Sequence, residues 1–144
     1  MIVNTIGRLL VSYKNVEILN LHAYKITQNQ LKTLEELYPD TKKESYIKKL
    51  KAVQTWSANL KTENDYQTHS TDILVPALDN GYYILAAESA DKKTDLFSYT
   101  AVQVTDIAII ETQTLTHQHY QVINRNNGKP ITGASVTLSF RKNY

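Results

Sequence analysis

Two histidines are the residues of this sequence whose types and spacing come closest to a chemical site. His117 and His119 lie in "HQHYQVINR", where alternation predicts a strand, so both side chains leave one face. Two imidazoles on one face could begin a zinc site, with Glu111 as the nearby third ligand. Because few other residues nearby could act as metal ligands, we predict that the two histidines are solvated and bind no metal. A small metal-binding or hydrolytic domain centred on this pair stays the third alternative for function.

A second group has the residue types of a hydrolytic triad. His69, Ser70 and Asp72 lie within four positions of one another in a predicted strand. Neighbours along a strand alternate between its two faces, so the three side chains cannot converge on one substrate atom. We predict no catalysis there.

Three glutamates carry no sign of acid–base chemistry. Glu35, Glu36 and Glu44 fall in predicted helical segments with lysines interspersed. They are not paired in an apolar setting that would raise a carboxyl pKa, which a general acid needs. We predict that they keep the chain soluble.

Aromatic residues and glycines also favour structural roles. Tyr82 and Tyr83 could form a stacking platform, but on a strand one of them faces the core and the other the surface. Trp56 is the only tryptophan, and we predict a core anchor. The glycines of residues 127–133 are too widely spaced for a phosphate-binding loop, and they precede a strand instead of a helix.

Composition narrows the classes of function. The 144 residues include 16 Lys and Arg against 14 Asp and Glu, a net charge of +2 that is spread along the chain and argues against nucleic-acid binding. The absence of cysteine excludes disulfides, thiolate metal sites, cysteine nucleophiles and thioesters. No stretch approaches the roughly 20 apolar residues of a membrane span, and the start lacks a signal peptide's apolar run.

Period-two alternation and turn residues predict several short strands. Residues 7–26 give two strands and a tight turn at Lys14-Asn15, and Thr105-Asp106 marks a bend or a handover between sheets. In residues 134–140, Val136, Leu138 and Phe140 share one face. The other predicted strands lie within 53–60, 65–75, 82–89, 96–110 and 117–125. Many short strands with turn signals predict a mainly β protein built as an antiparallel β-sandwich.

One region has helical periodicity. Thr27 and Gln30 have the spacing of a capping box, and Pro39 ends the run, which predicts a helix at about 28–38. Its apolar positions recur at helical intervals: Leu31, Leu34 and Leu37.

A second helical piece is predicted within residues 41–53. Tyr46, Leu50 and Val53 would share its apolar face. Together the two pieces make a helical insertion at about 28–51.

Four segments, taken in order, resemble the N-terminal macroglobulin domains of bacterial alpha-2-macroglobulin-like proteins of the Bacteroides type. They are "LLVSYKNVEILNLHAYKI", "DYQTHSTDILVPALDNGYYILAAES", "FSYTAVQVTDIAII" and "YQVINRNNGKPITGASVTL", which cover most of the chain outside residues 28–60. The resemblance implies a strand pair around the "YKN" turn, a hairpin through "VPALDNGYY" and a domain join at "VTDIAII".

The resemblance also implies a domain organisation. Residues 1–102 would form one macroglobulin-like, fibronectin type III-like sandwich with the insertion at about 28–51. Residues 103–144 would be the opening strands of a following, truncated β-sandwich.

The function implied is that of a non-catalytic structural domain in a large protease-trapping protein. Such proteins use a bait segment, and many use a Cys-Gln thioester, neither of which this sequence offers. We therefore predict no enzyme activity, no catalytic residue, no cofactor and no metal ligand. The expected partners are neighbouring domains of the parent chain, a protease that the parent traps, and another copy through exposed strand edges, with no nucleic acid and no membrane insertion. The fragment would be soluble, and its parent periplasmic or associated with the cell envelope.

The phrase "GKPITGASV" keeps an alternative open, because it also resembles the carboxypeptidase regulatory-like sandwich of bacterial surface proteins. The chain would then be a surface binding or adhesion module. Tyr82 and Tyr83 would be the first residues to test in glycan or protein binding.

Overall fold

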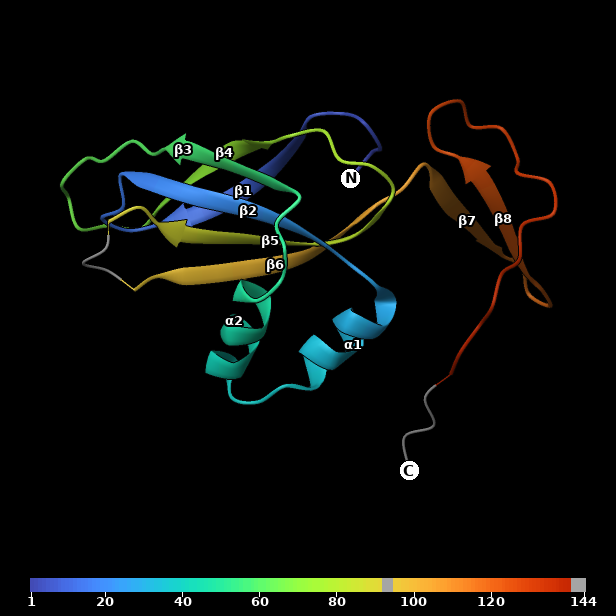
Figure 1. Ribbon diagram of the computed structural model, residues 1–144. Helices are drawn as coiled ribbons and strands as arrows, with labels where there is room; N and C mark the ends of the chain where they lie inside the picture. Colours follow the sequence, from blue (N-terminus) through green and yellow to red (C-terminus); the bar gives the residue numbers. More distant parts are fainter. Residues whose placement is uncertain (92–94, 141–144) are drawn as a thin grey trace. The chain divides into compact units, whose positions relative to one another are not determined.

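The computed structural model describes residues 1–91 and 95–140, and it divides the chain into two compact units, Met1–Val104 and Thr105–Tyr144. The protein is mainly β, with antiparallel sheets and two short helices, as the sequence predicts (Figure 1). None of the helices in the described part of the chain is long and apolar enough to cross a membrane.

A four-stranded sheet forms the centre of the first unit. Its strand order is β3-β2-β5-β6, and all neighbours are antiparallel. The strands are β2 (Ile18–Ile26), β3 (Gln54–Asn59), β5 (Gly81–Ser89) and β6 (Phe97–Val104). Four successive residues of β5 are buried, Tyr83–Ala86, so both faces of this strand are covered.

A two-stranded sheet packs on one face of the central sheet. It consists of β1 (Gly7–Tyr13) and β4 (His69–Val75), paired antiparallel over their full lengths. Buried residues from the two sheets meet in two apolar clusters, which include Tyr13, Leu21 and Ile73 in one and Val75, Tyr83, Leu85 and Val104 in the other. The two sheets and this core make a sandwich.

Helices α1 (Gln28–Glu36) and α2 (Asp40–Lys48) cover the other face of the central sheet (Figure 1). The Thr27 hydroxyl accepts a hydrogen bond from the Gln30 backbone N–H, and the Gln30 side chain accepts one from the Thr27 N–H, so the predicted capping box is confirmed.

The predicted apolar face of the second helix is partly wrong. Ile47 is its fully buried residue, with Tyr46 and Leu50 only partly buried beside it. Val53 lies beyond the end of α2 and is half exposed. The helix ends at Lys48, so the periodicity that placed Val53 on its face no longer applies.

The predicted pairing of the two strands in residues 7–26 is wrong, although both strands and their turn are present. β1 pairs with β4, and β2 pairs with β3 and β5. Asn15 takes a φ of 54° in the connection, a conformation that asparagine tolerates better than most residues. The buried Val16 follows it, so the chain passes from one sheet to the other instead of folding back.

The predicted hairpin through "VPALDNGYY" is also wrong, because the chain again passes from one sheet to the other between the two strands. β4 ends at Val75 in the two-stranded sheet, and β5 begins at Gly81 in the central sheet. Leu78 is buried between them. Gly81 has a φ of 153°, which residues with side chains rarely adopt, so the glycine suits the start of β5.

The second unit is a hairpin of β7 (Ile107–Gln113) and β8 (Gln118–Asn124). It follows the predicted break at Thr105-Asp106. After β8 the chain turns and makes one isolated bridge, between Ile123 and Pro130. The strand predicted at 134–140 is wrong, because no described segment pairs with it and Gly133, with a φ of 76°, turns the backbone just before it.

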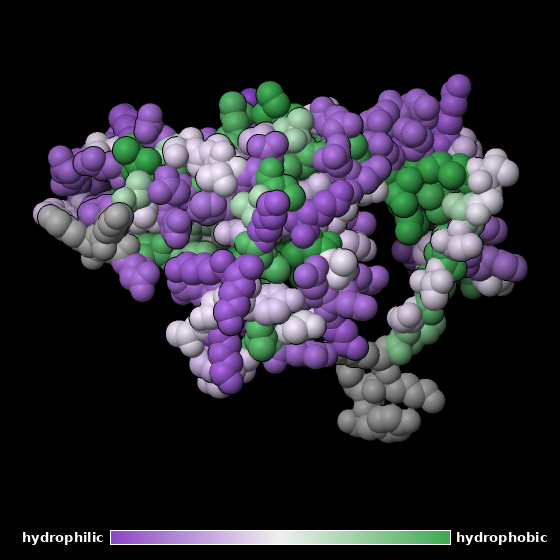
Figure 2. Space-filling view, viewed as in Figure 1, coloured by the Kyte–Doolittle hydropathy of each residue, from purple (hydrophilic) through white to green (hydrophobic). Residues whose placement is uncertain are grey.

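No described residue after Val104 is buried. Ile107, Ile109 and Ile110 are each more than two-fifths exposed. Apolar side chains are visible over the β7–β8 hairpin in Figure 2. The described part of this unit therefore has strands but no buried core, and an isolated two-stranded hairpin of this kind is at best marginally stable in water.

Replacing Ile47 by alanine should destabilise the first unit by about 2–5 kcal/mol, because it removes a fully buried side chain between α2 and the sheet. The control Val53→Ala, at a half-exposed position, should change stability by less than about 0.5 kcal/mol. Urea unfolding followed by circular dichroism measures both. Equal effects would contradict the packing described for α2.

A protein ending at Val104 should fold by itself, because every sheet of the first unit takes its strands from residues 1–104. We expect a cooperative urea transition with a midpoint close to that of the whole chain. Residues 105–144 alone should lack a cooperative transition. Loss of the sharp transition in the shorter protein would show that the first unit depends on the second.

Candidate functional site: a groove beside strand β1

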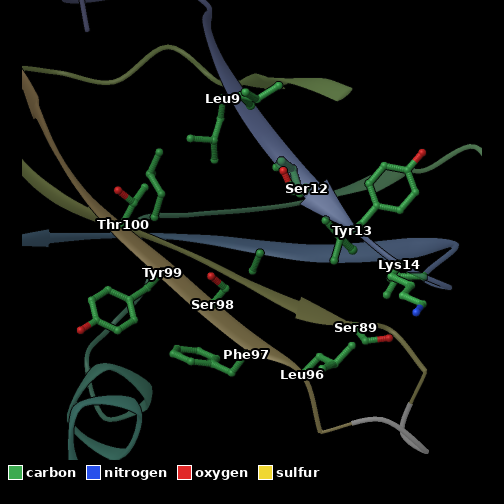
Figure 3. Close-up of a pocket in the computed structure, with 16 residues that line it drawn as sticks. Leu9, Ser12, Tyr13, Lys14, Ser89, Leu96, Phe97, Ser98, Tyr99 and Thr100 are labelled. Atoms are coloured by element: carbon green, nitrogen blue, oxygen red, sulfur yellow. The ribbon is translucent and has the colours of Figure 1, made fainter. Parts of the chain in front are cut away.

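Strand β1 has one unpaired edge. Among the described strands, β1 is hydrogen-bonded to β4 alone, and β6 is likewise an edge strand of the central sheet. A groove of about 610 Å³ lies beside β1 and is lined by residues of β1, β5 and β6 (Figure 3). An unpaired edge presents a row of backbone N–H and C=O groups, which makes it a template for another strand.

Inward-facing residues of β1 form one apolar wall of the groove. Leu9, Val11 and Tyr13 alternate with exposed residues, so the strand turns its apolar face to the central sheet. Leu85 and Ala87 of β5 line the groove from the central sheet. This lining makes the groove mainly apolar.

Hydroxyl residues of β6 keep the groove open. Ser98 lies opposite Ala87 and Thr100 opposite Leu85, so these side chains share the face that the two sheets have in common. Phe97 and Tyr99 lie on the other side of β6, where they pack beside the helices (Figure 3). Small, exposed side chains at Ser98 and Thr100 leave space that the two-stranded sheet does not fill.

The groove has the chemistry of a binding surface. Among the described residues that line it, Lys14 is the only charged one, and none is a histidine or a carboxylate. A serine or threonine hydroxyl needs an adjacent base to act as a nucleophile. The lining therefore favours contact with an apolar or extended segment over catalysis.

His22 joins three strands of the central sheet. Its Nδ1 lies 3.3 Å from the Thr55 hydroxyl and its Nε2 lies 3.1 Å from a Glu88 carboxylate oxygen. The order hydroxyl, imidazole, carboxylate is that of a hydrolytic triad. However, His22 and Glu88 lie on the interior strands β2 and β5, where ladders on both sides engage the backbone amides that an oxyanion hole would need. The group therefore acts as a cross-strand link.

Tyr24 lies beside this link, with its ring stacked near His22. Burial, and then the negative charge of Glu88, raise the pKa of the Tyr24 phenol. The phenol is therefore protonated at neutral pH.

The pair at His117 and His119, which we kept only as an alternative metal site, does not gain Glu111 as a third ligand. The two imidazole rings stack with centroids 6.0 Å apart, so they do share a face. His119 lies opposite Thr112, whereas Glu111 lies opposite Tyr120 and so leaves the other face of the hairpin. Glu111 instead accepts a hydrogen bond from the Gln118 side chain at 3.0 Å.

The structure separates His69, Ser70 and Asp72. His69 contacts Asp65 in the preceding loop, and the Ser70 hydroxyl lies 2.9 Å from that of Ser12 on β1. Asp72 is exposed. As the alternation predicts, the three side chains do not converge.

Aromatic residues singled out in the sequence are structural. Tyr83 is buried and its hydroxyl donates to the Asp79 carbonyl oxygen at 3.1 Å. Tyr82 is half-buried against the helix-side cluster. The Trp56 indole N–H donates to the Leu74 carbonyl oxygen at 3.1 Å and so links the two sheets.

The three glutamates and the glycine-containing turn also have structural surroundings without a feature of a catalytic or binding site. Glu35 and Glu36 are exposed on α1, while Glu44 pairs with Lys48 one turn later. That hydrogen bond raises the pKa of Lys48. Gly128 has nothing within 4 Å of the place a side chain would occupy, so it cradles no other group.

Sequence reasoning missed the groove, because an open edge depends on which strands pair. One local signal was available in β6. On the face of β6 that carries the buried Val104, every second residue going back along the strand changes from valine to a hydroxyl residue, at Thr100 and Ser98. This change marks the place where the two-stranded sheet stops covering β6.

No protein-family model matches the sequence, and no curated protein matches it significantly. Among solved structures, the chain is similar to native alpha-2-macroglobulin from Escherichia coli, in a crystal structure spanning domains MG0-NIE-MG1. The TM-score is 0.57 and the identity 14%, and the match covers 86% of this chain and 41% of that one. The two chains share a fold. This chain thus spans less than half of that alpha-2-macroglobulin fragment.

A bulky residue should be tolerated in the groove but not in the closed core. We expect Thr100→Phe to change the free energy of unfolding by less than about 1 kcal/mol, since the position is exposed. Val104→Phe, on the same face of β6 but only 1% exposed, should cost about 1–3 kcal/mol through overpacking. Urea titration compares the two. Equal losses would mean that the groove is closed in solution.

Proposed function

We propose that this chain is a non-catalytic structural part of a large alpha-2-macroglobulin-like protein of a bacterial envelope. The observation that carries the proposal is the fold shared with the Escherichia coli alpha-2-macroglobulin. That likeness covers 86% of the chain, which is more than the first unit alone can supply. The sequence resemblance to macroglobulin domains of the Bacteroides type agrees with it.

The second unit supports a role inside a larger protein. Its hairpin exposes three isoleucines and has no buried residue among those described. Strands supplied by neighbouring parts of a parent chain would cover this apolar surface and give the unit a core. A second copy is the other partner that the exposed edges would accept.

A scaffold role also agrees with the chemistry of the described residues. The groove has no base beside its hydroxyls, and the His22 group lies in a paired sheet. The sequence has no cysteine to form a thioester. In our proposal, any capture of a protease takes place elsewhere in the parent, in the periplasm or at the cell envelope.

Protease-trapping assays test this proposal. The longest protein that the reading frame encodes should leave a bound protease active on a small chromogenic peptide but inactive on casein. The 144-residue chain alone should neither inhibit the protease nor hydrolyse casein or esters. Stoichiometric inhibition or hydrolysis by the 144-residue chain would contradict the scaffold role, and absence of trapping by the longer protein would contradict its protease-trapping context.

The groove favours a second candidate, a surface module that binds a glycan or a protein. Tyr83 is buried, so its replacement would disturb the core and would not test binding at the surface. Thr100→Phe fills the groove instead, and Leu74→Phe, at an exposed position on the outer face of β4, serves as the control. Binding in a glycan or peptide array that Thr100→Phe alone abolishes would favour this candidate over the scaffold.

A further inference from the structure

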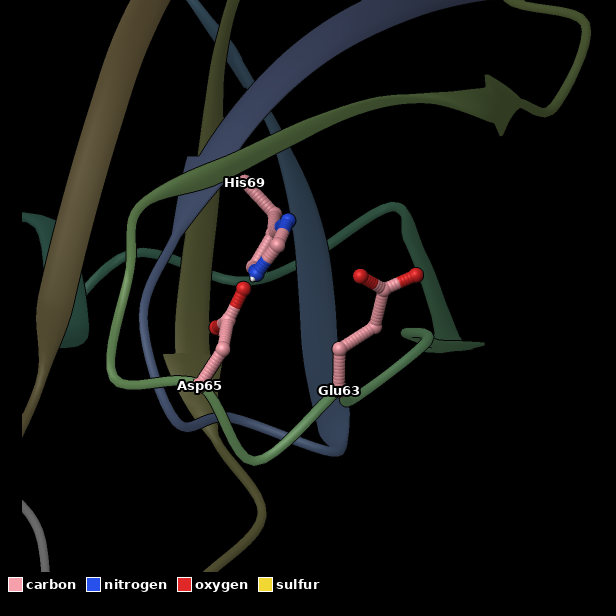
Figure 4. A group of neighbouring side chains, drawn as sticks. All are labelled: Glu63, Asp65 and His69. Carbon is pink, nitrogen blue, oxygen red and sulfur yellow. Dashed lines mark hydrogen bonds and ion pairs between the residues drawn. The ribbon is translucent and has the colours of Figure 1, made fainter.

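Three side chains with metal-binding atoms come together where the chain passes from β3 to β4. Glu63, Asp65 and His69 each offer one ligand atom, and these atoms all lie within 4.8 Å of one another (Figure 4). Glu63 and Asp65 lie in the connecting loop, while His69 is the first residue of β4. The group lies in the first unit and is separate from the groove.

The histidine of this group is held in place by the sandwich. His69 lies opposite Tyr13 in the β1–β4 ladder, and the two rings are 6.0 Å apart between centroids. The Tyr13 hydroxyl donates to the Lys61 carbonyl oxygen at 2.6 Å, which ties the start of the loop to β1. The strand therefore fixes the imidazole, and the loop brings the carboxylates to it.

The two carboxylates differ in how firmly they are held. An oxygen of Asp65 lies 2.8 Å from Nε2 of His69 and accepts a hydrogen bond from the Gln67 backbone N–H at 3.0 Å. Glu63 is half exposed and forms an ion pair with the exposed Lys61, at 3.0 Å. That surface ion pair is weak enough for a cation to displace.

We propose that Glu63, Asp65 and His69 form a binding site for a divalent transition-metal cation of the Zn²⁺ class. The imidazole decides the class of cation. Exposed carboxylates by themselves would bind hard cations, and only weakly, whereas a histidine nitrogen beside the carboxylates suits Zn²⁺ and similar transition-metal ions. Tetrahedral coordination at about 2.0–2.2 Å would place ligand atoms roughly 3.3–3.5 Å apart. The cation would replace the proton between Nε2 of His69 and the Asp65 oxygen, and this proton would pass to water while the two atoms separate from 2.8 Å to that spacing. The exposed Glu63 side chain closes the remaining distance, and water completes the coordination.

A cation here would fasten the β3–β4 loop to the first residue of β4. A cation that binds the folded chain and not the unfolded one stabilises the fold by mass action. The site is independent of the scaffold proposal, because it needs only the first unit. It also differs from the pair at His117 and His119, which shares one face but lies on the other side of its hairpin from Glu111.

Titration of the untagged 144-residue protein with zinc chloride, followed by calorimetry, tests the site. We expect one Zn²⁺ per chain at micromolar concentrations. His69→Gln should weaken binding at least tenfold, and Glu63→Gln, which alters an exposed side chain with little risk to folding, at least threefold. His119→Gln is the matched control and should leave the affinity within twofold. Circular dichroism of each variant checks the fold.

Co²⁺ provides a second readout through its visible absorption. The proposed mixed nitrogen and oxygen coordination should give an absorption band that is lost in His69→Gln and kept in His119→Gln. Three results would overturn the proposal: no binding of Zn²⁺ up to millimolar concentration, an unchanged affinity in the folded Glu63→Gln and His69→Gln proteins, or loss of binding in His119→Gln instead.

Discussion

Pairing between β2 and β5 is the constraint on which the rest of the first unit depends. Both strands are interior to the four-stranded sheet, and apolar residues leave both of their faces. Tyr83 and Leu85 face the second sheet, while Ile84 and Ala86 face the helices. A shift of one residue in register would exchange these two sets. The positions of β1, β4, α1 and α2 are therefore fixed by one register.

Unequal sheets produce both candidate sites. Because two strands cover four, the inner face of β6 is left open at Ser98 and Thr100, and β1 keeps a free edge. Because β3 and β4 belong to different sheets, the chain must also cross from β3 to β4 through a loop. That loop carries Glu63 and Asp65 to His69. The groove and the proposed metal site are thus two results of the same sandwich topology.

Sequence patterns predicted the features that depend on a few neighbouring residues, and they failed for the features that depend on which strands pair. The capping box at Thr27 and the mainly β composition were evident, because turn and cap chemistry act over a few residues. Strand partners were wrong in 7–26, since alternation says which face is apolar but not which strand lies beside it. Residues 134–140 alternate well and still form no strand, because a strand requires a neighbour. The sequence did not indicate the proposed metal site, because Glu63 and Asp65 lie in a loop whose residues follow no periodic pattern.

The first unit begins at β1 and ends at β6, and these two strands belong to different sheets. In a multidomain protein under tension, force would enter this unit through its first and last strands. β1 is held by one ladder, to β4, whereas β2 and β5 each have two strand neighbours. β6 is likewise held by one ladder, to β5, so pulling would detach β1 or β6 before it separated β2 from β5, and both of these edge strands border the groove.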